Sequence, residues 1–129
     1  MSDRVRIIEH GIVLLDFSGI TEPDKELHRS AEAKKLIASQ PLGRALVLTD
    51  VTGSNFTQRA IDSLKDLVQH NKPYVKASAL VGLSALTRVV FRAVVTLTRR
   101  DIKVFDSRAE AIRYLLSKRA PEPVLPVSD

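Results

Sequence analysis

The chain has no cysteine among its 129 residues, which excludes a disulfide framework and a thiolate metal site. It also has no long apolar run, whereas a membrane-spanning helix needs roughly 20 such residues, so an integral membrane protein is not expected. Met1 is followed at once by polar residues, which argues against a secretory signal. Together these absences predict a cytoplasmic protein.

The common catalytic signatures are also missing. The chain contains no G-x-S-x-G, no G-x-x-x-x-G-K-[ST] and no G-x-G-x-x-G. Its three histidines, His10, His28 and His70, fall in a turn, a helix and a helix end, without the spacing of metal ligands. Asp16 and Asp50 both fall near strand ends, but no base or metal partner accompanies them. We therefore predict a protein that is not an enzyme and that has no cofactor and no metal.

The net charge of +5 raises the question of whether the chain binds nucleic acid. No glycine–arginine run, no interleaved aromatic residues and no zinc-finger spacing accompany the basic residues, so the pattern favours a solvated basic face over a nucleic-acid footprint. The basic residues are densest at Arg88, Arg92, Arg99, Arg100, Lys103 and Arg108.

The hydrophobic pattern alternates between strands and helices. Strand patterns cover residues 4–9, 12–17, 45–50, 76–81 and 102–105. Helical patterns cover residues 21–39, 57–70, 84–98 and 108–118, with a hydroxyl cap expected at Thr21, a left-handed Asn71 ending the second helix and a capping box at Ser107. This β-β-α-β-α-β-α-β-α order predicts an α/β fold whose mixed sheet has parallel later strands. We expect one domain over residues 1–119 and a flexible, proline-rich tail at 120–129.

The segment 46–57 is the most informative part of the chain. An apolar strand ends in Thr49 and Asp50, and a polar loop then leads to Thr57 at the start of a helix. Open α/β sheets place their sites at this carboxyl end of the strands. A phosphate on Thr57 would be tolerated at the helix N-terminus. The candidate partner-binding or regulatory residues are Asp50, Thr52, Ser54, Asn55 and Thr57, with Thr57 as a candidate phosphoacceptor. The alternative is that these residues only satisfy turn and cap hydrogen bonds.

The third helical segment is apolar over more than half of its circumference. Its expected core stripe consists of Ala85, Leu86, Val89, Val90, Ala93, Val94 and Leu97. Arginines line another face, and Phe91 and Val95 are expected on a flank between the two. Such a helix usually buries a second surface, which could be a homodimer contact, a protein partner or an anionic membrane in peripheral contact. The alternative is burial by a neighbouring helix or by the tail. The candidate ligand or interface residues are Leu86, Val90, Phe91, Val94 and Val95.

With these elements in place, the chain resembles the STAS-domain superfamily, in particular its bacterial SpoIIAA-like (STAS/SEC14-like) group. The resemblance covers about residues 4–118 in the order of elements, and it is strongest at 46–52, at Thr57, and at 81–86 and 102–106. In STAS domains that act as anti-sigma-factor antagonists, a D-S-S-G motif lies at the loop–helix junction, and a partner kinase phosphorylates its second serine. Aligned through Asp50, that motif falls on residues 55–58: Thr57 keeps the hydroxyl, while Asn55, Phe56 and Gln58 depart from the pattern.

The sequence therefore predicts a non-catalytic STAS-like regulatory or protein-interaction domain that presents residues 50–57 and the following helix to a protein partner. The alternative is a carrier or sensor of a small apolar or amphipathic, lipid-like ligand. In that case Leu86, Val90, Phe91 and Val94 would line a pocket beneath the third helix.

Overall fold

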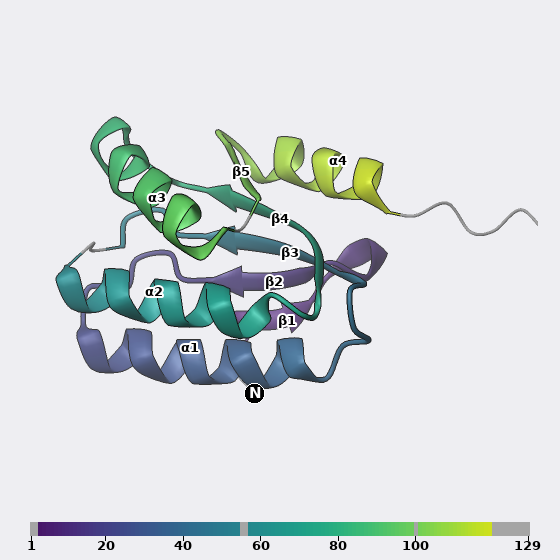
Figure 1. Ribbon diagram of the computed structural model, residues 1–129, viewed down its shortest axis with the longest axis horizontal. Helices are drawn as coiled ribbons and strands as arrows, with labels where there is room; N and C mark the ends of the chain where they lie inside the picture. The colour runs from purple at the N-terminus through teal and green to yellow at the C-terminus, as the bar shows by residue number, and fades with distance from the viewer. Residues whose placement is uncertain (1–2, 55–56, 100, 120–129) are drawn as a thin grey trace, which may run out of the picture.

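The computed structural model describes residues 3–54, 57–99 and 101–119, and in these ranges it shows a five-stranded sheet and four α-helices (Figure 1). The strands are β1 (Val5–Ile7), β2 (Val13–Asp16), β3 (Ala45–Asp50), β4 (Val75–Val81) and β5 (Ile102–Phe105). The helices are α1 (Pro23–Ala38), α2 (Gln58–Asn71), α3 (Ala85–Thr98) and α4 (Arg108–Lys118), with a 3-10 turn at Glu9–Gly11. The predicted α/β class is confirmed. The predictions for Asn55 and for the tail at 120–129 lie outside the described residues.

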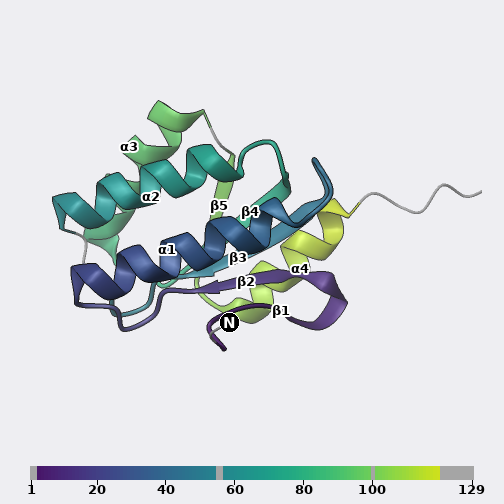
Figure 2. The same cartoon turned by 90° about the horizontal axis from the view of Figure 1, so that it is seen from below.

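The sheet is mixed. Its spatial order is β1-β2-β3-β4-β5, with β1 antiparallel to β2 and every other neighbouring pair parallel. One face packs against α1, α2 and α3, and the other packs against α4 (Figure 2). Because β3 is covered on both faces, its residues from Ala45 to Leu48 are apolar without alternation.

Two predicted helix ends differ from the structure. Helix α1 begins at Pro23, and Glu22, which makes no side-chain cap hydrogen bond, occupies the N-cap position predicted for Thr21. Asn71 is the last residue of α2 and is buried, with its Oδ1 3.0 Å from His70 Nδ1. The right-handed backbone continues through Asn71 to Lys72, so Asn71 does not adopt the left-handed conformation that we predicted. The residue that does so at a helix end is Arg99, after α3 (φ 55°).

Helix α3 turns a different face to the core from the one predicted. Its buried residues are Phe91, Val94 and Thr98, so the expectation that Phe91 lies on a flank outside the core stripe is wrong. Three large members of the predicted core stripe, Leu86, Val89 and Leu97, are 77%, 65% and 66% exposed. The physical reason is tertiary packing: Phe91, which is 3% exposed, joins the core cluster between the sheet and helices α1 and α2, and this contact fixes which of the two apolar faces of α3 is buried.

Candidate functional site

Two matching turns lie side by side where β2 and β3 end. Asp16 and Asp50 are directly paired in the parallel ladder. Oδ1 of Asp16 accepts hydrogen bonds from the backbone N (3.0 Å) and Oγ (2.6 Å) of Ser18, and Oδ1 of Asp50 accepts the same pair of bonds, at the same distances, from Thr52. Each turn then continues into a glycine with positive φ. The repeated D-x-[ST]-G pattern was visible in the sequence, but sequence reasoning missed it.

Arg108 joins the two turns. Its Nε lies 2.8 Å from Oδ2 of Asp50, and its Nη2 lies 3.5 Å from Oδ2 of Asp16. Burial alone would raise the pKa of Asp16, but hydrogen bonds from Ser18 and the charges of Arg108 and Arg4 outweigh it, so that this pKa lies below its ordinary value. Asp50 is only 7% exposed. The predicted site residue Asp50 is thus engaged in an ion pair that anchors α4 to the sheet.

The side-chain hydroxyls of Thr52 and Ser54 bond within the β3–α2 loop. The hydroxyl of Thr52 bonds to Asp50, and the hydroxyl of Ser54 donates to the carbonyl of Val51 at 2.8 Å. Thr57 is the N-cap of α2, and its Oγ1 accepts a hydrogen bond from the backbone N of Ala60 at 3.1 Å. These bonds are the turn and cap hydrogen bonds that the sequence offered as the alternative to a binding role for these residues. They nevertheless leave Thr52 and Thr57 exposed to solvent.

The cap at Thr57 gives a testable effect on stability. Thr57→Ala should lower the free energy of unfolding by about 1 kcal/mol because one N-terminal amide of α2 loses its acceptor. Thr57→Asp keeps an acceptor at a favourable end of the helix and should lie within about 0.5 kcal/mol of the wild type. Urea unfolding measures the stability of both variants. Thr96→Ala is the control, since it also removes a threonine hydroxyl, but one that bonds to a carbonyl within α3. Equal losses for Thr57→Ala and Thr57→Asp would contradict the cap assignment.

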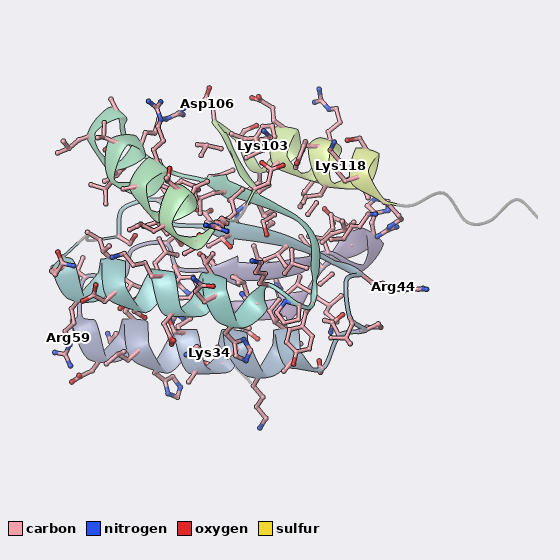
Figure 3. The ribbon with its side chains drawn as sticks, in the orientation of Figure 1. Lys34, Arg44, Arg59, Lys103, Asp106 and Lys118 are labelled. Carbon is pink, nitrogen blue, oxygen red and sulfur yellow. The ribbon has the colours of Figure 1, made fainter. Side chains whose placement is uncertain are left out.

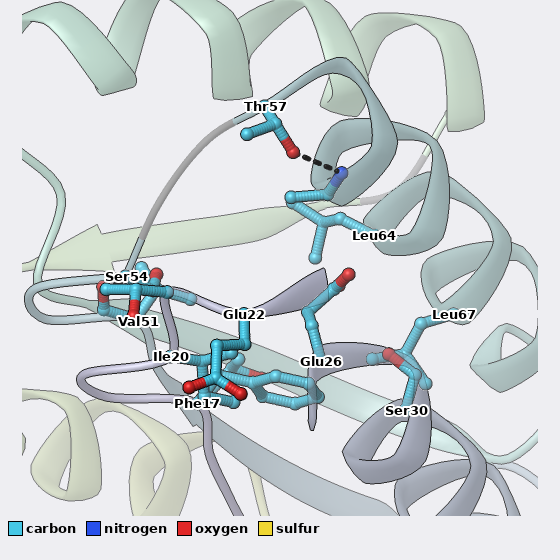
Figure 4. Close-up of a pocket in the computed structure, with 13 residues that line it drawn as sticks. Phe17, Ile20, Glu22, Glu26, Ser30, Val51, Ser54, Thr57, Leu64 and Leu67 are labelled. Atoms are coloured by element: carbon cyan, nitrogen blue, oxygen red, sulfur yellow. Dashed lines mark hydrogen bonds between the residues drawn. The ribbon is translucent and has the colours of Figure 1, made fainter. Parts of the chain in front are cut away.

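A cavity of about 50 Å³ lies between α1 and α2 at the same edge of the sheet (Figure 4). Its wall is mainly apolar, and polar groups line part of it, among them Glu26, Ser54 and Thr57. Burial raises the pKa of Glu26, against a hydrogen bond from Ser63 and the charge of Arg59, so this carboxyl is a weaker acid than usual. Sequence reasoning did not predict a cavity here, because the residues that form it come from four separate segments.

The predicted pocket beneath α3 is small. The space there is about 20 Å³, and Phe91 is the candidate residue that lines it. Val94 is buried in the helix–sheet contact, Val90 and Val95 are half-buried, and Leu86 is exposed. An apolar cavity that admits benzene has about 150 Å³, so neither this space nor the cavity between α1 and α2 has room for an acyl chain.

Several basic residues near α3 have acidic partners. Arg88 pairs with Asp106 at 2.8 Å, and Lys103 pairs with Asp101 at 3.3 Å. Within the described ranges, no cluster of three or more histidine, aspartate or glutamate side chains is placed to hold a metal ion. In the same ranges, no helix has the length and apolarity that crossing a membrane requires.

Comparisons of this chain with protein-family models, with curated proteins and with solved structures found no match. What the chain does is therefore inferred from its own residues and their geometry.

Proposed function

We propose that the chain is a STAS-like regulatory domain that acts in the cytoplasm by binding a protein partner and has no catalytic activity of its own. Its partner surface consists of the β3–α2 loop and the first turn of α2. The order of elements along the described chain and the hydroxyl of Thr57 at a helix start support this proposal. The resemblance to STAS domains rests on the order of elements and on the residues at 46–52, Thr57, 81–86 and 102–106.

The observation that carries the proposal is an exposed loop on a rigid base. Thr52 and Gly53 are exposed, yet Asp50 at the start of the same turn is held by Thr52 and by Arg108. Because these bonds already hold residues 50–52, this part of the loop loses less conformational entropy when a partner binds. Open parallel sheets also place their binding sites at this edge.

Thr57 is the regulatory residue of this surface. It is exposed at the N-terminus of α2, whose first turn contains no acidic residue. A phosphate would add about −1.5 to −2 charges at neutral pH at a place where the helix dipole favours negative charge. Phosphorylation would therefore leave the fold intact while reversing the local charge of the partner surface.

Site-specific photo-cross-linking in the native host tests this proposal. A photoreactive amino acid replaces Gln58, which is exposed at the start of α2, or Arg113, which is exposed on α4 on the other side of the sheet. We expect a single protein adduct from position 58 that is absent from position 113, that purified wild-type chain outcompetes, and that Thr57→Asp weakens. Identical adducts from both positions, or none from position 58, would overturn the proposed surface.

The alternative function, a carrier of a lipid-like ligand, has less support. The cavity between α1 and α2 holds about 50 Å³, one third of the space that admits benzene. A carrier would need the helices to separate before the ligand could enter.

A further inference from the structure

Helix α3 exposes a continuous row of apolar side chains. Leu86, Val89 and Leu97 are 77%, 65% and 66% exposed, and Ala93 between them is also exposed. We call these four residues the α3 stripe; their spacing of three, four and four places them along one side of the helix. In the described part of the chain the other exposed large hydrophobic residues lie singly on different segments, at Ile7, Leu27 and Leu42. Scattered residues of that kind need no explanation, whereas a row on one helix does.

Positive charge is concentrated around the same helix. Residues 84–108 contain six lysine and arginine residues and two aspartates, so this segment carries +4 of the net charge of +5. Helix α3 itself has no acidic residue. Within the described residues, Arg88, Lys103 and Arg108 form ion pairs, whereas Arg92 and Arg99 do not. A surface that covers the stripe should therefore be negatively charged at its margin.

Figure 3 shows Lys103 on β5 and Asp106 just after it. Lys103 pairs in register with Ala79, whose face of the sheet is covered by α4, so Lys103 does not border the stripe. Asp106 pairs with Arg88 and Asp101 pairs with Lys103. Among the described residues, this leaves Arg92 on α3 and Arg99 at its C-cap without an ion pair. Arg92 is three residues from Val89 and directly precedes Ala93, and it therefore flanks the stripe.

The area of the stripe favours a membrane over a second copy of the chain as the surface that covers it. Its three large side chains offer roughly 300 Å² of apolar area, well below the roughly 800 Å² per partner of a stable protein interface. Two copies paired through antiparallel α3 helices would also bring their Arg92 side chains close together, because Arg92 lies near the middle of the stripe. A lipid surface needs only shallow insertion of a few apolar side chains together with attraction to basic residues.

We propose that the α3 stripe inserts into the surface of an anionic lipid membrane, with Arg92 and Arg99 contacting the phosphate headgroups. The stripe lies on a different helix face from Phe91, Val94 and Thr98, which are buried. Insertion therefore requires no rearrangement of the core. This membrane contact goes beyond the protein-binding function and does not depend on it, since it uses α3 and not the β3–α2 loop.

Co-sedimentation with vesicles tests the proposal. The vesicles are either phosphatidylcholine alone or equal parts phosphatidylcholine and phosphatidylglycerol. We expect at least tenfold tighter binding to the anionic vesicles, and a fall in binding between about 0.05 and about 0.5 M NaCl because the added salt screens exposed charges. Equal binding to both kinds of vesicle, or binding to neither, would overturn the proposal.

Variants separate insertion from general attraction between charges. The double variant Leu86→Ser with Val89→Ser should bind anionic vesicles at least tenfold more weakly, while Leu42→Ser, at an exposed leucine far from α3, should bind like the wild type. Arg92→Gln and Arg99→Gln should each weaken binding about fivefold, and Arg44→Gln should not. Circular dichroism checks that each variant is folded.

Two further results would overturn the proposal. If the leucine–valine double variant binds like the wild type, the attraction is only electrostatic and the stripe does not insert. If analytical ultracentrifugation shows a wild-type dimer that this double variant abolishes, and vesicles do not bind, a second copy of the chain covers the stripe.

Discussion

Gly82→Ala should lower the free energy of unfolding by about 4 kcal/mol, a sum of backbone strain and overpacking. Gly82 lies between β4 and α3 with φ +97°, a conformation that side chains other than glycine rarely adopt. A β-carbon at this position would overlap with Oγ1, N and Cα of Thr52. Two of these three atoms belong to the backbone of the β3–α2 loop, so the overlap cannot be relieved by rotating a side chain.

Gly43→Ala is the matched control for this prediction. Gly43 also has a positive φ, +69°, but a β-carbon there would have no neighbour within 4 Å. This variant should lose only about 1 kcal/mol of stability, from the conformational strain. Urea unfolding of both variants separates the cost of the contact with Thr52 from the cost of the positive φ angle. Equal losses in the two variants would show that Gly82 is needed only for its φ angle and that its contact with Thr52 contributes nothing.

The Gly82 contact also concerns the proposed partner surface. Because the overlap involves Thr52, a Gly82→Ala chain that still folds must move the β3–α2 loop. In such a chain we expect a weaker cross-link from position 58 as well as a lower stability. The close approach of the two loops thus links the start of α3 to the loop that carries Thr52.

The sequence was sufficient for features that depend on local chemistry. The apolar run before Asp50 predicted a strand over 45–50, and β3 has those bounds because both faces of the sheet are covered. Ser107 caps α4 by accepting from the amide of Glu110, as the capping box predicted. Thr57 caps α2 in the same way. In each case the partners are within a few residues of one another, so that a single segment contains the whole signal.

Features that depend on tertiary packing could not be predicted. Helix α3 has two apolar faces, and nothing within the helix itself determines that the face with Phe91 is buried and the face with Leu86 exposed. The link between Arg108 and Asp50 spans 58 residues, and it exists only because β5 and α4 return to the carboxyl edge of the sheet. The cavity at Glu26 likewise requires α1 and α2 to lie side by side.

Replacing Arg108 removes the cation shared by two carboxylates. Breaking a buried ion pair by removing one partner typically costs about 3–5 kcal/mol, but the Arg108 side chain is 41% exposed, so water can enter and reduce the cost. We therefore expect Arg108→Met to lower the free energy of unfolding by about 2–3 kcal/mol at pH 7. Arg113→Met, at an exposed arginine of the same helix, should stay within about 0.5 kcal/mol of the wild type.

The pH dependence of the stability lost in Arg108→Met identifies the cause of that loss. In the wild type the pKa of Asp16 is lowered, so the stability that its charge contributes is present above the ordinary value near 3.8 and is lost as the pH falls through the folded-state pKa. In Arg108→Met the two carboxylates repel each other, and taking up a proton relieves the repulsion. The difference in stability between variant and wild type should therefore be largest at pH 7 and shrink at acid pH. Adding Asp50→Asn to Arg108→Met should restore at least about 1 kcal/mol at pH 7. If the loss is the same at neutral and acid pH, then Arg108 stabilises the fold by packing and not by its charge.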